Sequence, residues 1–196
     1  MKKLLILFTV LVLSIGFACT ASAELTDSVL EGKVVIEGVF YQMPIPVQQL
    51  LADGWTFDRE DIVLENQQRT SVVFVKDNVA FYSWVINEYA EPKKVSETHV
   101  AVMEFGPAAT GTEKYDLIDV QFSNTVNINT TEKELMKALG DPSTTAGGYP
   151  VWRGNNAKYV SPSVSFGAKF DSKLFSSELK YFIIEYMPAD FTVEAD

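Results

Sequence analysis

At residues 130–142 the chain reads Thr130-Thr131-Glu132-Lys133-Glu134-Leu135-Met136-Lys137-Ala138-Leu139-Gly140-Asp141-Pro142. This stretch predicts one short helix whose first turn is marked by two residues. Thr131 can cap the N-terminus with its hydroxyl, and Glu134, three residues later, can reach back to complete a capping box. We therefore expect the helix to begin directly after Thr131.

The end of the same helix is marked as clearly as its beginning. Gly140 supplies a residue that tolerates positive φ after the last turn, and Pro142 prevents the helix from resuming. Helical spacing places an apolar face on one side, made of Leu135, Ala138 and Leu139. Because the chain on both sides is strand-like, we expect this helix to be the single helix of a small α/β unit.

An earlier part of the chain has a similar order of elements. Residues 33–41 predict a strand with a bulge at Gly38, and residues 46–54 predict a short helix that closes at a glycine. Residues 116–122 and 131–140 repeat this order about 85 residues later, a period that suits a duplicated subdomain. The sequence therefore predicts an α+β fold of two similar subdomains, 24–107 and 108–196, each a short helix packed on an antiparallel sheet of about four strands.

Period-two patterns and turn residues predict the remaining strands. The clearest hairpin joins Ser71–Lys76 to Val79–Asn87 through Asp77-Asn78, two residues that tolerate positive φ. Further strands are expected at residues 62–64, 98–105, 149–153, 163–170 and 178–187.

The pattern Thr-x-x-Glu-Leu-x-x-x-Leu-Gly-x-Pro at Thr131–Pro142 resembles a signature of small exported bacterial domains. These include outer-membrane assembly lipoproteins of the SmpA/OmlA kind and the tandem-repeat β-lactamase-inhibitor-protein family. The resemblance implies a helix that packs on an antiparallel sheet of about four strands. It covers residues 114–187 well and 33–105 loosely, where Trp55 stands in place of the expected x-Pro. The first half also resembles exported Gram-positive proteins with no assigned activity. No contact residue of the inhibitor family lies within the matching motif.

The N-terminus has the form of a signal peptide, residues 1–23. Lys2 and Lys3 precede an uncharged run at 4–18 that is short for a membrane span, and Ala21-Ser22-Ala23 forms an A-x-A cleavage site. We expect cleavage before Glu24 and therefore a secreted protein.

Cys19 offers an alternative to simple secretion. Ala18-Cys19 resembles the end of a bacterial lipoprotein signal, in which the cysteine becomes the lipidated first residue, although Gly16 stands where that signal usually has leucine. In that case the mature protein is membrane-anchored. If Cys19 is removed with the signal, the mature chain has no cysteine and no thiol or disulfide chemistry.

Composition narrows the choice of partners. The chain carries a formal charge of −10, which becomes −12 when Lys2 and Lys3 leave with the signal peptide. Nucleic acid and anionic lipid both need a basic surface, so we expect no nucleic-acid partner and membrane contact only through a lipidated Cys19. With 47% hydrophobic residues, the chain can bury a core.

The sequence gives little support to catalysis. His99 is the only histidine, so no triad and no site of several imidazoles can be built, and no phosphate-binding or dinucleotide motif is present. The densest acidic cluster, Asp58-Arg59-Glu60-Asp61, reads as a solvated loop. We expect no enzyme, and we assign no catalytic, cofactor-binding or metal-binding residue.

Because the sequence gives little support to catalysis, a binding role is the first interpretation. Exposed tyrosine and tryptophan residues often carry binding energy, and the candidates on predicted strands are Tyr82, Trp84, Tyr149 and Trp152. We expect an exported, non-catalytic binding module that recognises a protein or cell-envelope component. One alternative is a structural or assembly lipoprotein of the envelope, tethered through Cys19. Another is a hydrolase that uses paired carboxylates.

Overall fold

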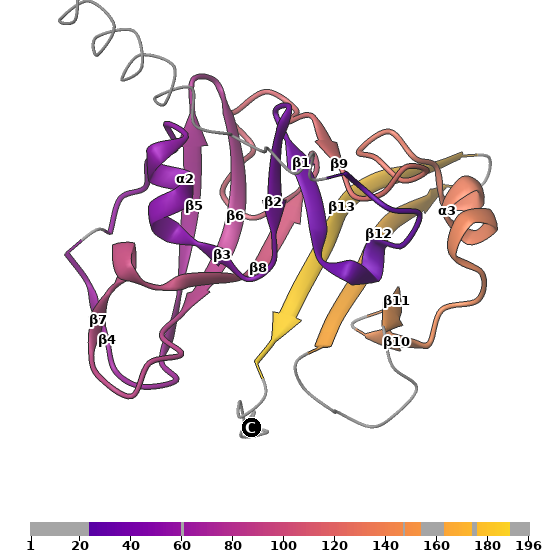
Figure 1. Ribbon diagram of the computed structural model, residues 1–196. Coiled ribbons are helices and arrows are strands. Elements are labelled where there is room, and N and C mark those ends of the chain that lie inside the picture. Colours follow the sequence, from indigo (N-terminus) through magenta and orange to yellow (C-terminus); the bar gives the residue numbers. More distant parts are fainter. Residues whose placement is uncertain (1–23, 60, 147, 154–162, 174–175, 189–196) are drawn as a thin grey trace, which may run out of the picture.

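The computed structural model describes residues 24–59, 61–146, 148–153, 163–173 and 176–188, and its centre is one large antiparallel sheet (Figure 1). Seven strands follow in the order β10-β11-β12-β13-β8-β6-β5, and β3 pairs with β8 beside them. The strands are β3 (Ile45–Pro46), β5 (Arg69–Lys76), β6 (Val79–Ile86), β8 (His99–Phe105), β10 (Thr144–Ala146), β11 (Tyr149–Arg153), β12 (Ser163–Lys173) and β13 (Ser176–Met187).

The large sheet joins the two halves of the chain. β8 pairs with β6 on one side and with β13 on the other, through pairs such as Tyr82 with Glu104 and Glu104 with Ile183. Four strands come from before residue 108 and four from after it, but they share one eight-stranded sheet. The α+β class is confirmed. The predicted arrangement of two subdomains, each with its own sheet of about four strands, is not confirmed.

A smaller sheet corrects one prediction. Residues 33–41 are not a single bulged strand: β1 (Lys33–Ile36) and β2 (Val39–Gln42) form a hairpin. Glu37 and Gly38 between them both have positive φ. A two-residue turn of the primed type needs this backbone conformation. Of the expected strand at 116–122, only β9 (Val120–Gln121) forms, and it pairs with β1.

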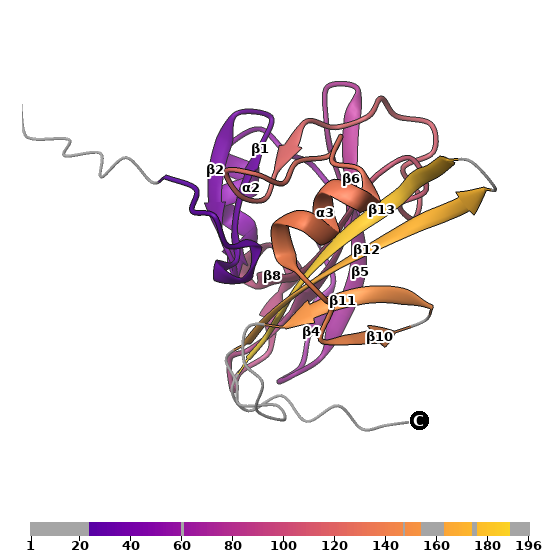
Figure 2. The same ribbon diagram turned by 90° about the vertical axis from the view of Figure 1, so that its right-hand side faces the viewer.

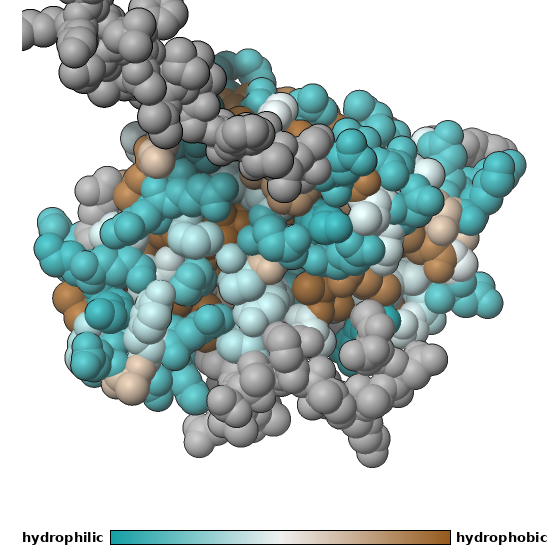
Figure 3. Space-filling view, in the orientation of Figure 1, coloured by the Kyte–Doolittle hydropathy of each residue, from teal (hydrophilic) through white to brown (hydrophobic). Residues whose placement is uncertain are grey.

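Two α-helices and the small sheet cover one face of the large sheet. Figure 2 shows α2 (Val47–Ala52), the β1–β2 hairpin and α3 (Glu132–Leu139) on the same side. Two 3₁₀ turns, η1 (Val29–Glu31) and η2 (Val95–Glu97), and a two-stranded ribbon of β4 (Val63–Leu64) and β7 (Lys93–Lys94) complete the described elements. Hydrophilic residues predominate on the outer surface of this covering layer (Figure 3).

The helix α3 begins as its sequence predicts. The Thr131 hydroxyl accepts a hydrogen bond from the Glu134 backbone N–H at 3.4 Å, and the Glu134 carboxylate accepts one from the Thr131 N–H at 3.0 Å. Gly140 follows the last turn with φ 73° and ψ −159°. Only glycine adopts this region readily. The apolar face is narrower than expected: Leu135 is buried and Leu139 half-buried, whereas Ala138 is exposed.

The core lies between the covering layer and the large sheet, and a chain of aromatic rings runs through it. In the first half Trp55 meets Phe81 with ring centroids 5.0 Å apart, and Phe81 meets Phe105 at 5.4 Å. Phe105 in turn contacts Phe122 at 5.7 Å, and Phe122 contacts Phe166 at 5.1 Å. All five side chains are buried, so the hydrophobic core is continuous across both halves.

Candidate binding surface

The second face of the large sheet carries no helix among the described residues. Its tyrosines and Trp84 are partly exposed, whereas Val102 and Val151 on the same face are buried. Along β6 the residues alternate: Phe81, Ser83 and Val85 are buried, whereas Tyr82 and Trp84 are half-exposed. We call this second side the open face. It displays Ser71, Val73, Tyr82, Trp84, Val102, Glu104, Tyr149, Val151, Ser165, Gly167, Lys169, Tyr181, Ile183 and Glu185.

Strand register sets the neighbours on the open face. Glu104 of β8 lies between Tyr82 and Ile183 in one row of cross-strand pairs. Trp84 lies opposite Val102 in the next row, and Val102 lies opposite Glu185. Side chains directly opposite one another in such rows are close enough to interact, so Glu104 is a neighbour of Tyr82, and Val102 lies between Trp84 and Glu185.

A glycine makes room for Tyr149. A Cβ atom at Gly167 would lie 2.9 Å from Cε2 of Tyr149 and 2.8 Å from Cγ2 of Ile183, closer than real contacts allow. Because Gly167 lacks a side chain, the Tyr149 ring can lie across β12, where its centroid is 6.1 Å from that of Tyr181 in an edge-to-face arrangement. The two tyrosines thus form a pair that the backbone of β12 holds in place.

Trp84 is held from two sides. The Tyr82 ring meets it edge-on with centroids 6.3 Å apart, and the Arg69 guanidinium lies over it at 5.1 Å from the ring centroid. A cation over an indole face is an attractive arrangement. Tyr82 and Trp84 therefore form a second aromatic pair on the open face.

Of the four aromatic candidates, the structure places Tyr82, Trp84 and Tyr149 on the open face and excludes Trp152. Trp152 is 4% exposed and belongs to the core, and its indole N–H donates a hydrogen bond to the Gly140 carbonyl at 3.1 Å. The prediction of Trp152 as a binding residue was therefore wrong, because strand alternation turns its side chain towards α3. Tyr181, which was not among the predicted candidates, lies on the same face as the other three.

Negative charge shapes the chemistry of the open face. Burial raises the pKa of Glu104 above its ordinary value. Hydrogen bonding from Thr110, whose hydroxyl lies 3.4 Å from Oε2 of Glu104, lowers this pKa by a smaller amount. Burial also raises the pKa of Tyr149, and the charges of Glu185 and Glu104 raise it further. For Tyr181 the causes of the raised pKa are burial, Tyr149 and Glu104. Both tyrosines therefore keep their hydroxyl protons at neutral pH and can donate hydrogen bonds.

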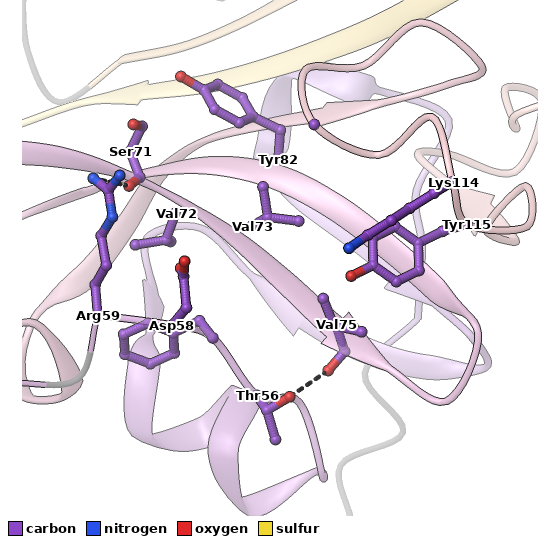
Figure 4. A pocket seen from close by; sticks show the side chains of 12 residues that line it. Thr56, Asp58, Arg59, Ser71, Val72, Val73, Val75, Tyr82, Lys114 and Tyr115 are labelled. Atoms are coloured by element: carbon purple, nitrogen blue, oxygen red, sulfur yellow. Dashed lines mark hydrogen bonds between the residues drawn. The ribbon is translucent and has the colours of Figure 1, made fainter.

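A groove of about 630 Å³ adjoins the open face along β5 (Figure 4). Val73 and Tyr82 line it and belong to both surfaces. Its walls come from two distant segments, one that holds Asp58 and Arg59 and one that holds Lys114. The sequence alone predicts that Asp58 and Arg59 belong to a solvated loop. They are exposed as expected, but the fold places them on the same groove as Lys114, which no local sequence pattern could indicate.

The remaining candidates lie elsewhere or outside the described residues. His99 is half-buried at the start of β8, with Nδ1 3.9 Å from Oε2 of Glu88 and the Tyr89 ring beside it. Within the described ranges, no three histidine, cysteine, aspartate or glutamate side chains form a group that could hold a metal ion. Cys19 and the expected signal peptide lie outside the described residues, and no described helix is long and apolar enough to cross a membrane.

No protein-family model matches the chain, and neither a curated protein nor a solved structure matches it. The resemblance of Thr131–Pro142 to the SmpA/OmlA and β-lactamase-inhibitor-protein families therefore stays a prediction.

Proposed function

We propose that this protein is an exported, non-catalytic binding module that recognises a protein partner through the open face. One observation carries the proposal. Tyr82, Trp84, Tyr149 and Tyr181 gather, half-exposed, on the side of the sheet that α2, α3 and the β1–β2 hairpin leave uncovered.

The four aromatic side chains suit binding because they are already positioned. Tyrosine and tryptophan offer a large contact area and few rotatable bonds, which is why they are common where binding energy is concentrated. Gly167 and Tyr181 fix the Tyr149 ring, and Arg69 and Tyr82 fix the Trp84 ring. Residues that are ordered before association lose less conformational entropy in the complex.

The carboxylates on the open face indicate which partner surface would fit. Glu104 and Glu185 lie among the aromatic residues, and the whole chain is acidic. Complementary charge would come from a partner that presents lysine, arginine or hydrogen-bond donors to the centre of the sheet.

The expected signal peptide and the two halves of the chain fit a role in the cell envelope, which we include in the proposal. The expected signal peptide at 1–23 would direct the protein out of the cytoplasm. A duplicated pair of subdomains, 24–107 and 108–196, would place one helix over each half of the shared sheet. Mass spectrometry of the mature N-terminus separates secretion from anchoring. A chain that starts at Glu24 indicates release, whereas a lipidated Cys19 supports the structural or assembly lipoprotein.

Binding through the open face is tested by comparing variants for capture of a partner from the native cell envelope. Trp84→Ala and Tyr149→Ala should each weaken capture of the same protein by about tenfold or more, since such residues often contribute about 2 kcal/mol. Met136→Ala is the matched control, because Met136 is an exposed apolar residue on α3, which covers the opposite side. If both open-face variants fold and capture the partner as the unchanged chain does, the proposal is wrong.

The hydrolase alternative has one specific geometry to support it. Glu104 and Glu185 are diagonal neighbours on the adjacent strands β8 and β13. Residues at diagonal positions lie about 7–8 Å apart along the backbone, a spacing from which two carboxyl groups could reach the separation of an inverting glycosidase pair.

The surroundings of these two carboxylates do not favour hydrolysis. Glu185 lines a small cavity that Glu104 does not line. That cavity has room for little more than one water molecule. Neither this cavity nor the groove beside β5 is lined by both carboxylates. Hydrolysis of envelope glycans that Glu104→Gln abolishes would support this alternative over binding alone.

A further inference from the structure

The groove beside β5 has a strand edge as its floor. β5 is the last strand of the large sheet, so only one of its sides is paired with β6. At one end of the groove Thr56 forms an antiparallel bridge with Val75, with both N–H···O distances at 2.8 Å. At the other end the Arg59 guanidinium donates a hydrogen bond to the Ser71 carbonyl at 3.4 Å. Val73 lies between these two contacts.

The backbone groups of Val73 point into the groove. Residues along an antiparallel strand turn their N–H and C=O groups alternately to one neighbour and to the other. The N–H and C=O groups of Val75 both point away from β6, because they bond to Thr56. Val73 lies two residues earlier, so its N–H and C=O groups also point away from β6. No described residue bonds to them. Val73 therefore offers one donor and one acceptor, spaced for a single β-bridge.

The charges around the groove differ from those of the chain as a whole. Arg59 and Lys114 line the groove together with Asp58, which gives a local charge of +1 in a chain whose total is −10. Among the described residues neither Arg59 nor Lys114 forms a salt bridge. Figure 4 shows Arg59 at one end, Val73 in the middle and Lys114 towards the other end. An occupant that follows β5 would pass both cations.

We propose that this groove takes a short extended segment of a partner polypeptide, which forms a β-bridge with Val73 and places carboxylates beside Arg59 and Lys114. Addition of a strand to an exposed sheet edge is a common mode of peptide recognition, in which backbone bonds give affinity and side chains give specificity. This inference rests on the proposed function, because it adds an acidic segment of the partner to the contact with the open face. Val73 and Tyr82 connect the two surfaces.

Charge disfavours a second copy of this chain as the occupant. An edge-to-edge pair of two β5 strands would bring the Arg59 and Lys114 of one copy towards those of the other, and like charges across such a contact are costly. An acidic extended peptide meets the same groove with complementary charge.

The experiment measures binding of labelled peptides of about nine residues, in which glutamate alternates with valine, isoleucine, threonine or tyrosine, with lysine counterparts as controls. We expect the acidic set to bind at least about tenfold more tightly than the lysine set. Arg59→Ala and Lys114→Ala should each lower the affinity for acidic peptides about fivefold, and Asp58→Asn should raise it. Lys133→Ala on α3 is the control and should leave the affinity unchanged.

A pair of substitutions at Val73 tests the backbone contact. Val73→Pro removes the N–H that faces the groove and leaves the ladder to β6 intact, since proline is tolerated on a strand edge whose N–H faces outward. Val73→Ala shortens the side chain but keeps that N–H. We expect Val73→Pro to abolish peptide binding in a folded protein, as judged by circular dichroism, and Val73→Ala to retain it.

Three outcomes would overturn the inference. These are equal binding of acidic and lysine peptides, unchanged binding by Val73→Pro, and a concentration-dependent dimer that Val73→Pro abolishes, which would show a second copy in the groove. Failure of this inference is distinguishable from failure of the proposed function. If Trp84→Ala abolishes capture of the partner and Val73→Pro leaves it unchanged, the open face binds and the groove does not contribute.

Discussion

The indole N–H of Trp152 on β11 donates a hydrogen bond to the carbonyl oxygen of Gly140, directly after the last turn of α3, at 3.1 Å. This bond joins the end of the helix to the sheet on which it packs. Gly140 has no side chain, so its described contact with β11 is made by its backbone carbonyl.

Trp152→Phe should lower the free energy of unfolding by about 1–2 kcal/mol, since it removes that hydrogen bond and leaves unfilled volume in the core. Urea denaturation measures the loss. Trp84→Phe is the matched control, because Trp84 is half-exposed on the open face, and it should cost less. Equal losses at the two positions would contradict the role given to Trp152.

Gly140→Ala should destabilise the protein by about 1–3 kcal/mol, because side chains oppose the backbone conformation at this position. Gly140 has φ 73° and ψ −159°. A Cβ at Gly140 would have no atom within 4 Å, so the cost comes from the backbone and not from a clash. Thermal unfolding gives the comparison with Ala138→Ser, an exposed change on the same helix. A melting midpoint that Gly140→Ala leaves unchanged would count against this account of the helix end.

Gly167→Ala should displace the Tyr149 ring and destabilise the protein by about 1–3 kcal/mol, as overpacking does in a filled site. A double-mutant cycle with Tyr149→Ala measures how much of that loss comes from the ring. We expect Gly167→Ala to cost less when Tyr149 is absent, with the remainder due to Ile183. Full additivity of the two changes would show that the ring and the glycine do not interact.

The pH dependence of stability should differ in sign between two glutamates. The folded state raises the pKa of Glu104 above its ordinary 4.5. Glu104 therefore stabilises the fold when protonated and loses that contribution as pH rises through its folded pKa. Glu104→Gln should gain stability over the unchanged protein as pH rises above 4.5.

Glu134 provides the opposite case. Hydrogen bonds from the Thr131 backbone and side chain lower the pKa of Glu134 below 4.5. Its contribution is therefore present above the ordinary pKa and is lost as pH falls through the folded pKa. Glu134→Gln should be less stable than the unchanged protein at neutral pH, and this difference should shrink in acid. Denaturation from about pH 3 to about pH 8 measures both variants, and a shared sign would refute the assignment.

Local structure was predictable wherever neighbouring residues in the sequence determine it. The capping box of α3, the β5–β6 hairpin and β11 follow from turn residues, caps and short periodicities. The Glu37-Gly38 turn was missed, although a glycine at the second turn position was a visible signal for a hairpin.

Long-range pairing was not predictable in the same way. Nothing in the sequence around Val120 indicates that it pairs with Ile36, and nothing around Phe105 indicates that β8 pairs with β13. The same limit applies to the candidate site. Alternation along β6 indicated that Tyr82 and Trp84 share a face, but only the assembled sheet shows which face is covered.

The contact between Phe105 and Phe122 affects how the molecule responds to heat and to truncation. Because the rings and the pairing of β8 with β13 continue across the middle of the chain, neither half can melt without exposing an apolar surface and an unpaired strand edge of the other. The chain should therefore unfold in a single calorimetric transition. A fragment that ends near residue 107 should aggregate through the bare edge of β8 and not persist as an independent module.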